Sequence, residues 1–130
     1  MYHKHAWAPH FERGKERFAF MQSHFRAPVN IYKTENSYEL LVFAPGRVKE
    51  NFSVKTQGNQ LIVSYMPPEG LPHPDWIKRE YSRGAFERIF SIDESMDVTN
   101  IKANYADGVL QVSLPIIPGK ETPQQNIPVN

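Results

Sequence analysis

The chain has 130 residues, which is enough for one domain with little left over for a second. Fifteen basic and fourteen acidic residues leave a net charge of +1, so we expect neither a basic surface nor a nucleic acid partner. The absence of cysteine excludes disulfide bonds and thiolate metal sites and suits a reducing compartment. With no secretory signal and no apolar stretch of about 20 residues, we expect a cytoplasmic protein without a membrane partner.

Residues 1–27 are expected to form an N-terminal arm that is partly helical or disordered. Phe11, Phe18 and Phe25 recur at every seventh position, so one helical face could gather them. Gly14 lies inside that stretch and would cost a helix about 1 kcal/mol relative to alanine. No strand pattern accompanies these rings, and together with Phe20 they form an apolar surface of the kind that marks a contact site.

Residues 28–117 read as a domain of short strands separated by turns, with no convincing helix among them. Strands are expected at 29–32, 38–43, 52–56, 61–65, 86–92, 101–105 and 109–114, with a further one at 76–82. Polar and apolar residues alternate in 52–56, which turns Phe52 and Val54 inward. Asp107-Gly108 is typical of a tight hairpin before the last strand. This spacing predicts an all-β fold, an antiparallel immunoglobulin-like β-sandwich.

Two segments of this chain are rich in proline. Prolines throughout 66–75 prevent a regular ladder of hydrogen bonds there, so a loop is expected. Residues 118–130 are expected to form an extended, solvated tail. Near its end Pro128 favours an extended backbone, so Ile127 and Val129 project to the same side as a two-pronged apolar knob. Stray aliphatic residues in a disordered tail are the alternative.

Four motifs, in this order along the chain, resemble those of the small heat-shock protein family, whose core is the α-crystallin domain. The first two are Pro45-Gly46, which follows an apolar strand, and the segment 84–90, which runs from a glycine to a phenylalanine. The third is the segment 103–115, in which an alanine precedes Gly108-Val109-Leu110 and the strand ends in proline. The fourth is the terminal Ile127-Pro128-Val129. The likeness covers about residues 28–130, and nothing before Pro28 matches.

The resemblance implies an ATP-independent holding chaperone that limits the aggregation of partly unfolded proteins. Such proteins form dimers that assemble into larger, exchanging oligomers. Client proteins would be captured by the aromatic residues of the arm, which are Phe11, Phe18, Phe20 and Phe25. They would also be captured by the groove that binds the C-terminal tail, described below, whenever that groove is vacant. Packing of these rings inside the oligomer is the alternative.

The resemblance also points to a dimer interface. In bacterial and plant members a strand on the long loop swaps into the partner subunit, which here makes Trp76, Ile77 and Tyr81 candidate interface residues. The loop is richer in proline and poorer in charge than is usual for the family, which leaves the swap open. Arg88 matches the arginine that supports the family's dimer interface. The alternation of its strand points the Arg88 side chain toward the core or a partner subunit, where a buried guanidinium needs a carboxylate partner. The alternative is that Arg88 lies on an edge strand with its side chain in water.

The tail knob requires an apolar groove beside a sheet edge. We expect this groove between the strand at 52–56 and the segment 98–105, lined by Phe52, Val54 and Val98. Burial of both aliphatic side chains contributes about 3–6 kcal/mol, whereas association costs about 4–15 kcal/mol, so one contact alone barely holds. Tails on both ends of a dimer raise the effective concentration and can close a cage.

No catalytic arrangement is recognisable, so we expect neither an enzyme nor a cofactor. The sequence lacks Gly-x-Ser-x-Gly, a phosphate-binding glycine loop and His-Glu-x-x-His. His3, third from a free amine, could bind Cu(II) or Ni(II) in a square plane, but any protein with histidine at that position does so. The second functional hypothesis is an adaptor, a CS-type co-chaperone sandwich that docks on a folded partner without forming cages.

Overall fold

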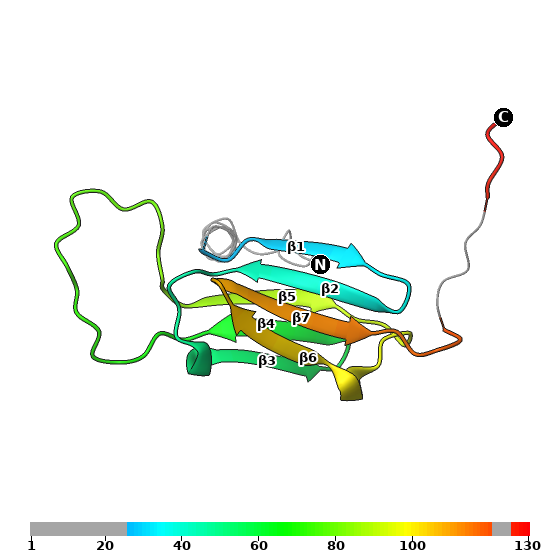
Figure 1. Cartoon of the computed structure of the whole chain (residues 1–130), viewed down its shortest axis with the longest axis horizontal. Coiled ribbons are helices and arrows are strands. Elements are labelled where there is room, and N and C mark those ends of the chain that lie inside the picture. Colours follow the sequence, from blue (N-terminus) through cyan, green and yellow to red (C-terminus); the bar gives the residue numbers. More distant parts are fainter. Residues whose placement is uncertain (1–25, 121–125) are drawn as a thin grey trace, which may run out of the picture.

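The computed structural model describes residues 26–120 and 126–130, which fold into two antiparallel β-sheets packed face to face (Figure 1). The four-stranded sheet has the order β1 (Val29–Lys33), β2 (Ser37–Phe43), β7 (Val109–Pro115) and β6 (Lys102–Ala106). The three-stranded sheet has the order β3 (Phe52–Gln57), β4 (Gln60–Tyr65) and β5 (Phe86–Ser91). Single 3₁₀ turns, η2 (Lys49–Asn51) and η3 (Val98–Asn100), precede β3 and β6. The described residues contain no helix long and apolar enough to cross a membrane.

The core lies between the two sheets and is built from alternate positions of the central strands. Because successive side chains of a strand point to opposite faces, a shift of one residue in register would turn the whole apolar set toward solvent. The observed register instead pairs Leu40 of β2 with Val112 of β7, both pointing into the core. The largest fully buried side chains are Leu61, Leu114, Val42, Val63 and Val112. The all-β sandwich expected from the sequence is confirmed.

The strands of both sheets form where the sequence predicts them, to within one residue at either end. Phe52 and Val54 pack against the core, as the alternating pattern of their strand requires. The turn before β7 is left-handed at both central positions, with φ of 53° at Asp107 and 77° at Gly108. Such a turn matches the right-handed twist of the strands it connects, which is why this pair of residue types predicted the hairpin.

The strand expected at 76–82 does not form within the single chain. Residues 66–85 run from β4 to β5 as a long loop that projects from one end of the sandwich (Figure 1). The side chains of residues 71–80 are all exposed. A strand is stable only beside a hydrogen-bonded neighbour, and this segment finds none within the part of the chain that the structure describes.

Candidate binding surfaces

A groove of mixed polar and aliphatic lining opens on one side of the sandwich, between the edge strands β3 and β6. Each of these strands pairs with one neighbour, so each keeps a row of main-chain groups free on its outer side. The groove has a volume of about 350 Å³ and is lined by Val54, Lys55, Thr56, Leu61, Val98, Ile101 and Ala103. Aliphatic side chains in the lining between two free strand edges suit an extended segment with alternate aliphatic side chains.

The structure brings Val54 and Val98 together in this groove, but Phe52 is not among its lining residues. The centre of the Phe52 ring lies 4.7 Å from that of Tyr105 and 4.9 Å from that of Tyr65. Phe52 therefore packs with these rings against the core at the start of β3. Because Phe52 and Val54 lie on the same face of one strand, the alternating pattern cannot tell which of them lines the groove and which packs among aromatic rings.

Val98 stands in the groove because a capped turn holds it there. The Asp97 carboxylate accepts hydrogen bonds from the Thr99 main-chain N–H at 3.1 Å, the Thr99 hydroxyl at 2.7 Å and the Asn100 amide at 2.7 Å. These bonds, that from Asn100 foremost, lower the pKa of Asp97 below its usual range. The side chain of Val98 is 44% exposed, which leaves it available to an incoming segment.

The tail residues predicted to form the knob are exposed in the single chain. Ile127 is 75% exposed and Val129 is 97% exposed, and Pro128 lies between them. Aliphatic side chains so open to water gain by burial against another surface.

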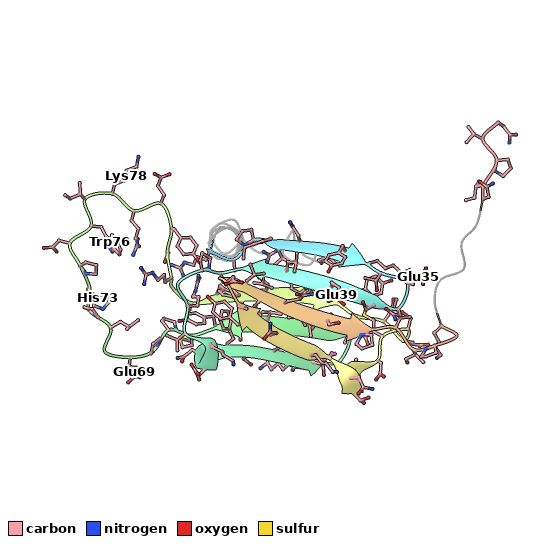
Figure 2. The ribbon with its side chains drawn as sticks, in the orientation of Figure 1. Glu35, Glu39, Glu69, His73, Trp76 and Lys78 are labelled. Carbon is pink, nitrogen blue, oxygen red and sulfur yellow. The ribbon has the colours of Figure 1, made fainter. Side chains whose placement is uncertain are left out.

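The loop carries the second group of exposed apolar side chains. Trp76 is 56% exposed and Ile77 is fully exposed, and Figure 2 shows Trp76 and Lys78 on the projecting part of the loop, away from both sheets. The Arg79 guanidinium lies 5.6 Å from the centre of the Trp76 ring. Tyr81, nearer the body, is 36% exposed. The three predicted interface residues of the loop are thus open to solvent.

Arg88 lies on the inward face of β5, opposite Val63 of β4. Its Nη1 donates to the main-chain carbonyl of Ala27 at 2.8 Å, and its guanidinium lies 5.7 Å from the centre of the Phe90 ring. The inward phase expected from the sequence is observed. The acceptor just named is a main-chain carbonyl rather than a carboxylate, and it fixes the chain immediately before β1.

Sequence reasoning missed Arg47, whose side chain is only 7% exposed. Its guanidinium donates to main-chain carbonyls and to the hydroxyl of Tyr81. It also lies 5.1 Å from the ring centre of Tyr65 and 5.3 Å from that of Phe86. An arginine after a Pro-Gly turn resembles any surface arginine, so no local signal marks it. The usable signal is indirect, because buried tyrosines need polar partners for their hydroxyls.

Sequence reasoning also missed Glu39, a 7% exposed carboxylate on β2 (Figure 2). Its oxygens accept hydrogen bonds from the hydroxyls of Ser113 at 2.6 Å and Ser37 at 2.7 Å and from the Gln111 amide at 3.0 Å. Burial by itself raises the pKa of Glu39, but the bonds from Ser113, Ser37 and Gln111 outweigh it and hold the pKa below its usual value. The carboxylate is therefore ionised at neutral pH.

No metal centre is found among the residues that the structure describes, since no three acidic or histidine side chains there are arranged to hold an ion. The proposed Cu(II) or Ni(II) ligand His3 and the four arm phenylalanines lie outside the described residues.

Comparisons with known proteins identify the relatives of this chain. The model of the Hsp20/alpha crystallin family matches residues 30–130. Heat shock protein 26 of Saccharomyces cerevisiae is 36% identical over 106 residues, which are 75% of this chain and 49% of the yeast protein. A probable 15 kDa heat shock protein of Leptospira interrogans is 31% identical over 87 residues, which are 67% of each chain.

A solved structure agrees as well. The small heat-shock protein from Xylella fastidiosa, described as having a distinct high order structure, superposes with a TM-score of 0.59 at 26% identity, covering 80% of this chain and 96% of that one. The chain spans about half the length of the yeast relative. The family match nevertheless includes the sandwich, the loop and the tail motif. The resemblance seen in the sequence is confirmed, and the chain belongs to the Hsp20/alpha crystallin family of small heat-shock proteins.

Proposed function

We propose that this protein is an ATP-independent holding chaperone that binds partly unfolded proteins and limits their aggregation, without acting as an enzyme. The family and the names of the relatives support this function. The observation that carries it is a groove between two free strand edges with aliphatic side chains in its lining, on a chain that also bears the exposed pair Ile127 and Val129. The monomeric adaptor is not favoured, because the relatives are heat-shock proteins.

In this proposal the tail of one subunit occupies the groove of another. An extended tail places Ile127 and Val129 on one side, where they can contact Val54 and Val98. Full burial of each aliphatic side chain contributes about 1.5–3 kcal/mol, which is comparable with the cost of association. Each contact is therefore weak, and assembly depends on repeated contacts between linked subunits. Such an assembly can exchange subunits and uncover the groove.

Dimers, on the same proposal, form when the loop of one copy adds to β1 of another. β1 is an edge strand, and its residues Ile31 and Tyr32 are 53% and 48% exposed. Segment 76–82 is the free partner, because its main chain lacks a strand neighbour in the single chain. Strand addition would supply the missing hydrogen bonds and would bury Trp76 and Ile77.

Client capture completes the proposal. Partly unfolded proteins expose apolar, extended segments, and the vacated groove offers such segments the same contacts as the tail does. The arm residues Phe11, Phe18, Phe20 and Phe25 are proposed as the second capture surface. The lack of cysteine supports a reducing, cytoplasmic setting, and the near-neutral net charge argues against nucleic acid or membrane partners.

The direct test compares the mass of the full-length protein with that of a version ending at Gln125. Size-exclusion chromatography with light scattering is expected to give large particles for the first and dimers for the second, because the truncation removes the knob but leaves the loop and β1. Asn126→Ala, which alters an exposed tail residue outside the knob, serves as the control and should keep the large particles. Identical elution of the full-length and truncated chains would show that the tail does not link subunits.

A further inference from the structure

Two segments far apart in sequence, the chain before β1 and the chain before β5, are joined by arginine side chains. Arg26 Nη1 donates to the Ala85 carbonyl at 2.7 Å, and Arg88 Nη1 donates to the Ala27 carbonyl at 2.8 Å. The first bond links the chain before β1 to the chain before β5, and the second runs back to the chain before β1 from Arg88, which lies within β5. Residues 26–28 are the root of the N-terminal arm, and residues 82–85 are the root of the 66–85 loop.

Arg47 contacts both roots at once. Its Nη2 lies 3.2 Å from the Arg26 carbonyl oxygen, 3.3 Å from that of Ser82 and 3.2 Å from that of Gly84. Its Nη1 contacts the hydroxyl of Tyr81, which itself donates to the Pro45 carbonyl at 3.1 Å. One buried guanidinium therefore bridges the arm root, the loop root and the turn from β2.

The packing around Arg47 leaves little room for another arrangement. Aromatic rings surround the guanidinium, with centres 5.1 Å away for Tyr65, 5.4 Å for Tyr81 and 5.3 Å for Phe86. A planar guanidinium can stack on rings and donate in several directions, which the ammonium of lysine cannot do in the same geometry. A Cβ added to Gly84 would lie 3.0 Å from Cζ of Arg26, so the Arg26 side chain would have to shift by a few tenths of an ångström to admit it.

We propose that Arg47 is a positioning residue that couples the loop to the N-terminal arm, so that the two roots are held together and released together. The functional meaning rests on the proposed function, in which the loop meets a second copy and the arm meets clients. Movement of the loop into a partner subunit then loosens the arm root through Arg47. Arg47 thereby links dimer contacts to client capture, beside the direct bonds of Arg26 and Arg88.

The test uses hydrogen–deuterium exchange on the full-length protein and two variants, Arg47→Lys and Tyr81→Phe. Tyr81→Phe removes a hydroxyl on the loop side only and leaves the arm root chemically unchanged. Coupling predicts that exchange in peptides 26–31 and 80–87 rises together in both variants, on the order of tenfold, the factor expected for a lost hydrogen bond to a charged group. Exchange in the core peptide 109–115 should stay as in the unaltered chain.

Tyr65→Phe is the matched control. It removes a hydroxyl that accepts the Val48 N–H at 3.1 Å on the same turn, and it keeps the ring beside Arg47. This variant should leave both root peptides protected. Faster exchange of the loop root alone in Tyr81→Phe would overturn the coupling, as would unchanged exchange in both variants.

The proposed function and the coupling through Arg47 can be disproved independently of each other. A monomeric full-length chain by light scattering would remove the proposed function, whereas exchange still reports whether the roots move together. If Arg47→Lys does not fold, Tyr81→Phe decides the question alone, because Tyr81 is 36% exposed and lies outside the core.

Discussion

At the scale of single residues, the sandwich buries two charged side chains, one cationic and one anionic. Arg47 and Glu39 are both 7% exposed and are not paired with each other. Both Nη atoms of Arg47 and both oxygens of Glu39 have the partners described above, whereas Nε of Arg47 has none within the part of the chain that the structure describes. Carbonyl dipoles and aromatic rings surround the cation, while two hydroxyls and an amide surround the anion. A buried charge without such partners costs several kcal/mol, so both sites specify the local structure strongly.

Glu39 predicts a pH dependence of stability. Its pKa in the folded state lies below the ordinary value of 4.5, so its contribution is present above that pH and is lost as the pH falls through the lowered pKa. Glu39→Gln is expected to reduce the free energy of unfolding at pH 7 by about 1–3 kcal/mol, because the serine hydroxyls lose a charged acceptor.

Urea unfolding at pH 7 and at pH 3 measures this effect. The difference between Glu39→Gln and the unaltered chain should shrink at the lower pH, because at pH 3 the carboxyl of the unfolded chain, with its ordinary pKa of 4.5, is protonated. Glu94→Gln, a change to an exposed carboxylate in a turn, should show little difference at either pH. An equal loss at both pH values would mean that the charge of Glu39 does not contribute.

Gly108 predicts a steric effect at the hairpin before β7. Its φ is 77°, and an added Cβ would lie 3.0 Å from Cβ of Pro45. Gly108→Ala therefore combines backbone strain with a clash and should lower the free energy of unfolding by about 2–4 kcal/mol. Gly58→Ala provides the control, because Gly58 has φ of 57° but nothing within 4 Å. Equal losses in thermal unfolding would contradict the role of the Pro45 contact.

At the scale of elements, the proposal gives the two edges of the sandwich different binding partners. β3 and β6 form the groove on one edge, with Leu61 of β4 at its base. β1 and β5 form the other edge, where Arg88 ties β5 to Ala27. Each edge leaves main-chain groups free, and each is matched by a segment without a strand partner in the single chain, the tail for one and the loop for the other.

Val54→Asp tests the groove directly. A carboxylate among Val98, Ile101 and Leu61 would be desolvated by a docked aliphatic side chain, so the tail should no longer bind. Light scattering is expected to show dimers, and the variant should protect a heat-aggregating test protein less well. Ser53→Asp is the control, because Ser53 is exposed on the opposite face of the same strand. Large particles from Val54→Asp, with the fold intact by circular dichroism, would place the tail contact elsewhere.

At the scale of the whole molecule, the separation of the two edges keeps the proposed interfaces independent. The groove edge and the loop edge lie on opposite sides of the sheet order, with the core between them. Loss of the tail should therefore leave dimers rather than monomers. A protein that releases clients and subunits without unfolding needs this independence, because the weaker contact can open while the stronger one persists.

Local pattern was sufficient for much of this protein. Alternation placed Val54 inward, Asp107-Gly108 set the last hairpin and the aliphatic pair around Pro128 stood out in a polar tail, because each signal depends on neighbours within a few residues. The surroundings of Phe52 and Val54, the burial of Arg47 and Glu39 and the lack of a strand at 76–82 came only from the tertiary structure. These features depend on which distant carbonyls, hydroxyls and strand edges meet when two sheets pack, and periodicity along one chain carries no information about that.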